Sequence, residues 1–102
     1  MKNYDRMVDV LTEEKERVAE AGSNRQGDVH LVFRKAIGPC CSLHLTTPYE
    51  RIFGQHLRSM ILNLARENGL EGVSIEAEDH GAWDYVFQAR FEACCRKWLQ
   101  KI

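Results

Sequence analysis

The chain has 102 residues, of which 44% are apolar and 28% charged, and its formal net charge is −1. This length and composition predict a single soluble globular domain over residues 1–102. The Lys and Arg residues are scattered and form no basic stripe with interleaved aromatics, which argues against nucleic-acid binding. No apolar run has the length of a membrane span and the N-terminus lacks a signal-peptide core, so we expect a cytoplasmic protein with no membrane partner.

Apolar residues recur with helical spacing from residue 4 to residue 20. We therefore expect an amphipathic helix there, forming an N-terminal extension over residues 1–21 ahead of a core over residues 22–102. Such a helix could pack on its own domain or on a partner. Its apolar stripe consists of Tyr4, Met7, Val8, Leu11 and Val18.

A small polar loop follows, from Gly22 to Gly27. The alternation of Val29, Leu31 and Phe33 with more polar residues then predicts a strand with one buried face. Gly38-Pro39 supplies a turn, and residues 40–46, "CCSLHLT", predict a returning strand. We expect these two strands to pair as an antiparallel hairpin.

The stretch "TPYE" predicts the start of a central helix. Thr47 suits the N-cap, Pro48 the first helical position, and Glu50 would complete a capping box. Asn68-Gly69 predicts its end, with Leu70 placed for the hydrophobic contact of a Schellman motif. The apolar stripe of this helix consists of Tyr49, Ile52, Phe53, His56, Leu57, Met60, Ile61 and Leu64.

The remaining sequence predicts two strands and a helix. "GVSIEAED" alternates so as to bury Val73, Ile75 and Ala77, "DHGA" turns the chain, and "WDYVFQA" predicts a further strand. That strand would place Trp83, Tyr85 and Phe87 on one face. From Arg90 the spacing is again helical, through Phe91, Cys94, Cys95, Trp98 and Leu99. The order α-β-β-α-β-β-α predicts an α+β two-layer sandwich, with a four-stranded, mainly antiparallel sheet and helices on one face.

The four cysteines form two adjacent pairs, Cys40-Cys41 and Cys94-Cys95. Neighbouring residues on a strand point to opposite faces, so one pair cannot easily chelate a single metal. We expect reduced cysteines that act as small hydrophobes, and no metal site. A zinc or redox site joining the two pairs stays open as an alternative.

The four histidines have ordinary structural explanations. His30 and His44 could be neighbours on the polar face of the predicted hairpin, and with a cysteine they form a second metal alternative, although their spacing matches no zinc module. His56 lies on the stripe of the central helix, where a core or boundary histidine is usual. His80 lies in a turn.

The sequence also argues against an enzyme. Cys41, Ser42 and His44 are close in the chain, but no nucleophile elbow or oxyanion-hole motif frames them. There is no Gly-rich phosphate loop. These observations predict a binding or carrier module rather than an independent catalyst.

Several segments resemble a known family. They are "DHGAWDYVFQARFEA", "YERIFG", "EGV", Ala21-Gly22 and Gly27-Asp28-Val29. The matching residues are Asp79, Gly81, Ala82, Asp84, Ala89, Arg90, Glu92 and Ala93, then Glu50, Phe53 and Gly54, then Glu71 to Val73. In these residues, from 21 to about 97, the chain resembles the acyl carrier (gamma) subunit of citrate lyase, whose broader family includes the carrier subunit of malonate decarboxylase. Independently of the resemblance, Asp79, Asp84, Arg90 and Glu92 could serve in turn capping and in an Arg–carboxylate pair.

The resemblance implies a non-catalytic carrier that works with lyase and acyl-transferase subunits. In that family a serine hydroxyl of the N-terminal loop holds a phosphoribosyl dephospho-coenzyme A group through a phosphodiester, and the terminal thiol of the group carries the acyl thioester. A tethered arm raises the effective concentration of the thioester at two separate active sites. It also requires a mobile, exposed attachment loop.

The chain departs from the family pattern inside this loop. Gln26 stands at the position of the family's serine, and an amide cannot form the phosphodiester. Ser23 supplies a hydroxyl three residues earlier, so Ser23 is the attachment candidate, with Gly22, Gln26, Gly27 and Asp28 as the other cofactor-binding candidates. The alternative is a divergent paralogue that is not loaded and serves as a binding or assembly module, with a stable partner or as a homo-oligomer.

Overall fold

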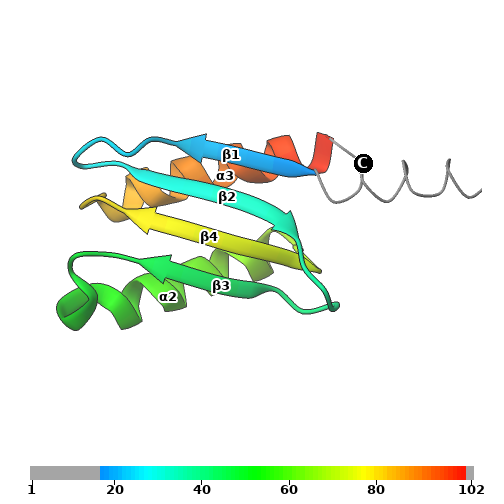
Figure 1. The fold of residues 1–102 in the computed structure, drawn as a ribbon, viewed down its shortest axis with the longest axis horizontal. Coiled ribbons are helices and arrows are strands. Elements are labelled where there is room, and N and C mark those ends of the chain that lie inside the picture. Colours follow the sequence, from blue (N-terminus) through cyan, green and yellow to red (C-terminus); the bar gives the residue numbers. More distant parts are fainter. Residues whose placement is uncertain (1–16, 101–102) are drawn as a thin grey trace, which may run out of the picture.

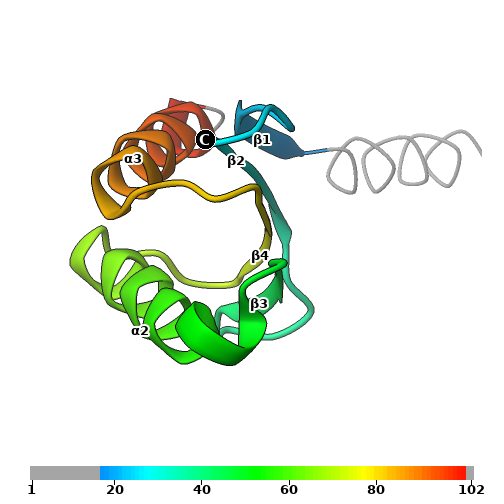
Figure 2. The same cartoon turned by 90° about the vertical axis from the view of Figure 1, so that its left-hand side faces the viewer.

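One four-stranded sheet with two helices makes up the part of the chain that the computed structural model describes, residues 17–100. The elements are β1 (Val18–Gly22), β2 (Val29–Lys35), β3 (Ser42–Thr46), α2 (Glu50–Glu67), β4 (Val73–Asp79) and α3 (Asp84–Gln100). The strand order is β1-β2-β4-β3 (Figure 1). Both helices cover the same face of the sheet (Figure 2). The predicted α+β class, with helices on one face of a four-stranded sheet, is confirmed.

The sheet is mixed, because one of its three pairings is parallel. β1 and β2 form an antiparallel hairpin, and β2 pairs antiparallel with β4. β3 runs parallel to β4, with Leu43 opposite Ile75 and Leu45 opposite Ala77. The predicted hairpin of β2 with β3 is therefore wrong, since β4 lies between them. The alternating pattern shows which face of a strand is buried but does not identify its neighbours, and α2 provides the long crossover that parallel strands need.

The N-terminal prediction is wrong over residues 18–20, which belong to β1 rather than to a helix. Ala19 and Ala21 are buried and lie opposite Phe33 and Leu31 of β2. Small buried residues at a spacing of two fit a strand, and their low hydrophobicity hid this period in the sequence. Residues 4–16 of the predicted helix lie outside the described residues.

The predicted strand around Trp83, Tyr85 and Phe87 is also wrong, because α3 begins at Asp84. Only Phe87 is buried, and the rings of Trp83 and Tyr85 are each 71% exposed. Phe87 starts the buried stripe of a helix that continues through Phe91, Cys94, Cys95 and Trp98. The element order is thus β-β-β-α-β-α over the described residues, in place of the predicted order.

The start of α2 differs from its prediction, whereas its end agrees. The helix begins at Glu50, and Thr47 caps no helical amide: its hydroxyl accepts from the Tyr49 N–H and donates to Asp79. Glu50 pairs with Arg58 instead of closing a capping box. At the other end, the N–H groups of Gly69 and Leu70 donate to Arg66 O and Ala65 O, the two hydrogen bonds of a Schellman motif.

The core lies between the sheet and the two helices and is centred on Phe33. The ring centroid of Phe33 lies 5.1 Å from that of Phe91 and 6.4 Å from that of Trp98. Cys94 is fully buried beside it, and its thiol donates to Ala19 O at 3.4 Å. Burial raises the pKa of Cys94 to about 12 and that of Cys95 to about 11, so both thiols are neutral near pH 7 and pack as apolar groups.

The four cysteines are free thiols, with Cys40 exposed in the loop between β2 and β3. Within residues 17–100 no group of three or more His, Cys, Asp and Glu side chains is arranged to hold a metal ion. Neither α2 nor α3 is long and apolar enough to cross a membrane.

The buried and exposed faces of α3 give a matched stability test. Phe91→Ala removes a ring that is 0% exposed and should lower the free energy of unfolding by about 3–5 kcal/mol. Leu99→Ala truncates a side chain that is 51% exposed and should change it by less than about 1 kcal/mol. Urea unfolding of both variants measures the difference, and equal losses would contradict the packing described here.

Candidate functional site

Three loops meet at one end of the sheet: residues 23–28 after β1, 47–49 after β3 and 80–83 after β4 (Figure 1). Hydrogen bonds join them directly. The Gly27 N–H donates to His80 O at 2.6 Å, and the His80 N–H donates to Asp28 O at 2.9 Å. The Thr47 hydroxyl donates to Asp79 Oδ2 at 2.8 Å. The predicted attachment loop is therefore attached to the start of α3 and, through Asp79, to the approach to α2.

Asp79 is buried and organises the turn after β4. Its Oδ1 accepts the N–H groups of Gly81 at 3.1 Å and Ala82 at 3.0 Å, while its Oδ2 accepts from Thr47. The turn-capping role expected of Asp79 from the sequence is confirmed. Each carboxylate oxygen has a donor, which a buried charged group requires.

Ser23 is the only hydroxyl-bearing residue among residues 23–28. It is half-buried, and its Oγ donates to Asp28 Oδ2 at 2.7 Å. The same Oγ accepts the Arg25 N–H at 3.3 Å. The hydroxyl therefore has one fixed direction inside the loop.

Asp28 connects this loop to α3. Its side chain, 13% exposed, accepts from Arg90 Nε at 3.0 Å, from Arg90 Nη2 at 3.3 Å and from the Val29 N–H at 2.8 Å. Burial raises the pKa of Asp28, but the hydrogen bonds from Ser23, Arg90 and Val29 together lower the pKa by more than burial raises it. The net pKa of Asp28 therefore lies below the ordinary value. Arg90 thus forms an Arg–carboxylate pair, but its partner is Asp28 and not Asp79, Asp84 or Glu92, among which the sequence analysis expected it.

The position of the family's serine lies at the tip of the loop. The Asp28 N–H donates to Arg25 O at 3.1 Å, which makes Gln26 and Gly27 the central residues of a turn. Gln26 is exposed there, and Gly27 has a φ of +86°. Gly27 supplies the positive φ that the third turn position of this kind needs.

Gly22 has a different structural reason. Its φ is +87°, and a Cβ atom at this position would lie 1.7 Å from Val29 O of the paired strand. Gly22 and Gly27 thus shape the loop. Of the five predicted cofactor-binding residues, only Ser23 offers a nucleophilic oxygen, and Asp28 holds it in place.

A groove of about 750 Å³ lies beside this loop, between the beginnings of α2 and α3. Tyr49 and Phe53 line it from the α2 side, with ring centroids 6.3 Å apart. Trp83 and Tyr85 line it from the α3 side. Sequence reasoning missed this groove because it assigned Trp83 and Tyr85 to a strand. Two exposed rings within three residues of a helix start were the signal that could have found it.

His30 and His44 lie on strands that flank β4 and are not adjacent, in contrast to the sequence prediction. His30 lies opposite Glu78 and His44 opposite Glu76. His30 Nε2 lies 3.2 Å from Glu20 Oε1, and His56 Nε2 lies 2.8 Å from Asp84 Oδ2 at the rim of the groove. His30 and His56 therefore each pair with a carboxylate, on different elements.

This fold and this loop define the class of protein. A small α+β domain presents the oriented hydroxyl of Ser23 in a loop at the end of the sheet, and Asp28 and Arg90 hold that loop in place. Comparison with known proteins identifies the family.

Residues 16–98 match the family model of the malonate decarboxylase delta subunit (MdcD). The chain is 35% identical over 74 residues to the citrate lyase acyl carrier protein of Streptococcus equi subsp. equi (strain 4047), covering 72% of each chain. It is 33% identical over 76 residues to that of Serratia proteamaculans (strain 568), covering 74% of each. The chain belongs to this family of citrate lyase and malonate decarboxylase acyl carrier proteins, as its sequence motifs predicted.

Among solved structures, the chain is similar to an RNase P protein from Thermotoga maritima in complex with 1-(4-fluorophenyl)-2-thiourea. The identity is 18%, the coverage 91% of this chain and 90% of the other, and the TM-score 0.38. A likeness of this size carries no argument about function.

The two loop glycines make a matched test of the loop's shape. Gly22→Ala forces a Cβ into Val29 O and should lower the free energy of unfolding by about 3 kcal/mol or more. Gly27→Ala meets no atom within 4 Å and should cost only about 1 kcal/mol for its positive φ. Urea unfolding compares the two, and a Gly27 variant as damaged as the Gly22 variant would contradict this assignment.

The Asp28 carboxylate should give a pH-dependent contribution to stability. Because its pKa is lower in the folded state, the contribution is complete above the unfolded value of about 3.9 and is lost as the pH falls through the lower folded value. Asp28→Asn should therefore cost about 1 kcal/mol at pH 7, since Arg90 is half exposed, and the deficit should shrink in acid.

Urea unfolding of wild type and Asp28→Asn over a pH series measures this deficit. Glu92→Gln, an exposed change on the helix that carries Arg90, is the matched control and should leave stability nearly unchanged. A deficit that keeps its pH 7 value throughout the acid range would contradict the role given to the carboxylate.

Proposed function

We propose that this chain is the acyl carrier subunit of a citrate-lyase-like complex, with Ser23 as the attachment point of a phosphoribosyl dephospho-coenzyme A arm. The observation that carries the proposal is the Ser23 hydroxyl, held 2.7 Å from Asp28 Oδ2 in the loop where the family is loaded. Family membership supports the carrier role. The relatives are named as carriers of citrate lyase, and the arm and its partners come to this chain as part of the proposal.

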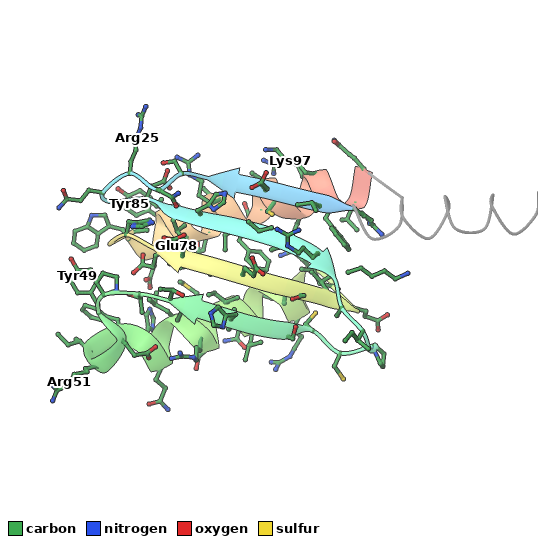
Figure 3. The ribbon with its side chains drawn as sticks, in the orientation of Figure 1. Arg25, Tyr49, Arg51, Glu78, Tyr85 and Lys97 are labelled. Atoms are coloured by element: carbon green, nitrogen blue, oxygen red, sulfur yellow. The ribbon has the colours of Figure 1, made fainter. Side chains whose placement is uncertain are left out.

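The loop fits the attached group in its chemistry. On loading, the Oγ–H bond of Ser23 breaks and its proton leaves to a base of the loading enzyme. The Oγ–P bond forms as a phosphoanhydride P–O bond of the arm's activated donor breaks, and the remaining phosphates of the donor depart as the leaving group. Asp28 orients the hydroxyl but is a weak base, because its pKa is lowered by its hydrogen bonds. The phosphodiester brings a negative charge close to this carboxylate. Arg90 already pairs with Asp28, which leaves Arg25 of the same loop (Figure 3) as the guanidinium group available to offset the added charge.

The resemblance led us to expect a mobile, exposed attachment loop, whereas this loop is held at its ends and in its middle. Its ends are fixed by the β1–β2 pairing, and its middle is attached to the β4–α3 turn by the Gly27 and His80 hydrogen bonds. A rigid base lets the length of the arm, rather than the motion of the loop, determine where the thioester reaches. In this proposal the chain contributes no catalytic residue, and the lyase and acyl-transferase subunits carry out the reactions, in the cytoplasm.

A second function is favoured by Gln26. The exposed tip of the loop carries this amide, whereas Ser23 is half-buried and occupied by Asp28. In this alternative the chain is a paralogue that is not loaded and keeps the carrier fold as a binding or assembly module.

Intact-mass measurement separates the two functions. The full chain is coexpressed with loading enzymes that modify an ordinary citrate lyase carrier, and residues 18–34 are then mapped as peptides. We expect wild type to gain the mass of one phosphoribosyl dephospho-coenzyme A, Ser23→Ala to gain none, and Ser42→Ala, altered at an exposed position of β3, to be loaded as wild type is.

Gln26→Ser restores the family's serine and completes the design. An unmodified wild type beside a loaded Gln26→Ser would show that the loop is recognised but its nucleophile is lost, which establishes the unloaded alternative. A Ser23→Ala variant that is still loaded would also overturn the assignment, because the attachment would then lie elsewhere.

A further inference from the structure

Four exposed aromatic side chains surround the groove between α2 and α3. Trp83 and Tyr85 are each 71% exposed, Tyr49 is 44% exposed and Phe53 is 49% exposed. All four line the same groove of about 750 Å³. Folding gains little from rings left in water, and a concave cluster of them marks a binding site.

The groove opens next to the attachment loop. Asn24 Oδ1 lies 3.2 Å from His80 Nε2, and His80 O accepts the Gly27 N–H. The next residue, Gly81, lines the groove, and a Cβ atom there would lie 3.6 Å from the Tyr49 ring. A group attached at the loop therefore begins at the margin of the groove.

The groove is lined by two carboxylates, Asp79 and Asp84, and by no Lys or Arg among the described residues. Figure 3 shows Arg25 and Arg51 extending from the end of the molecule where Tyr49 and Tyr85 lie. Both carboxylates already have hydrogen-bond partners: Asp84 Oδ2 lies 2.8 Å from His56 Nε2, and Asp79 accepts from the Thr47 hydroxyl and two backbone N–H groups. Neither arginine lines the groove itself, so the match to a ligand rests on the rings, whose faces suit a flat, uncharged base.

We propose that this groove binds the adenine nucleotide portion of the carrier's arm, with the purine stacked on the rings of Trp83 and Tyr85. The identity of the arm rests on the proposed function. Within that arm the nucleoside is the flat aromatic part and lies at the attached end, whereas the thiol is at the far end of the pantetheine. Stacking would hold the attached end against the carrier and leave the thioester end free to reach the partner subunits.

The two tryptophans of the chain provide the test. Trp83 lines the groove, and Trp98 is buried near the other end of α3. When dephospho-coenzyme A is titrated into the full, unmodified chain, we expect the indole N–H resonance of Trp83 to move in the NMR spectrum and that of Trp98 to stay in place. Adenosine 5′-monophosphate should reproduce the shift, and pantetheine should not.

Tyr85→Ala removes one stacking face and keeps the Trp83 reporter. It should weaken the affinity for dephospho-coenzyme A about tenfold. The matched control is Leu99→Ala, which truncates a half-exposed apolar residue of the same helix away from the groove and should bind as wild type does.

Two results would overturn the inference. A shift of the Trp83 resonance with pantetheine as large as that with dephospho-coenzyme A would assign the groove to the thiol end of the arm. If the Trp83 resonance stays in place with every nucleotide at millimolar concentration, the groove does not bind the arm and a partner protein becomes its candidate ligand.

The outcome is distinguishable from that of the loading experiment. An unmodified chain that binds dephospho-coenzyme A keeps the groove assignment while the attachment fails. A chain loaded at Ser23 whose Trp83 resonance equals that of the unloaded chain keeps the carrier function and removes this inference.

Discussion

The carboxylate of Asp28 is the contact on which the arrangement of the site depends. It joins the loop after β1 to Arg90 of α3, 62 residues away in the sequence, and it also holds the Ser23 hydroxyl and the first amide of β2. An isolated surface ion pair contributes little to stability. This pair gains from two Arg90 contacts and from low exposure of the carboxylate, and it uses both Asp28 oxygens. Its main effect is to fix the direction of the one hydroxyl in the loop.

The mixed sheet makes this contact possible. Because β4 lies between β2 and β3, the loop before β2 and the turn after β4 emerge side by side and share the Gly27 and His80 hydrogen bonds. The parallel pairing of β3 with β4 brings the start of α2 to the same end (Figure 1). The loop of residues 23–28 and the aromatic groove are neighbours because the start of β2 and the ends of β3 and β4 lie at one end of the sheet. A hairpin of β2 and β3 would also end β3 at this end, but it would displace β4 from β2, and with it the turn that shares the Gly27 and His80 hydrogen bonds.

The sequence predicts most of the fold from features that are local. The strand at Val73–Asp79 follows from strict alternation, and the end of α2 follows from Gly69 and Leu70, since a Schellman motif needs only neighbouring residues. The start of α3 was missed because Trp83, Tyr85 and Phe87 alternate by chance, and only tertiary packing shows that two of the rings face water. The partner of β3 was missed because pairing is a non-local property.

The candidate site, like the fold, was predictable in its local features and not in its long-range contacts. Motif resemblance located the loop and its family, and it also showed that Gln26 replaces the expected serine. It could not show that Asp28 holds Ser23, because the Arg90 contact joins distant parts of the chain. The groove could not be predicted from the sequence, because only tertiary packing shows that the rings of Trp83 and Tyr85 face water.

Conservation of this fold does not by itself decide whether the carrier is loaded. The loop owes its shape to the close approach of Gly22 to Val29, to the positive φ of Gly27 and to the Asp28 contacts, and the Gln26 side chain takes part in none of these. A serine or a glutamine at the tip is therefore compatible with the same loop. Loading depends on one hydroxyl oxygen. Ser23 carries such an oxygen, and the structure holds it by a hydrogen bond to Asp28. If Ser23 is the attachment point, the phosphodiester replaces the hydrogen bond to Asp28, and Arg90 must then hold the carboxylate without that donor. The loaded loop would thus rest more heavily on the Asp28–Arg90 pair than the unloaded loop does.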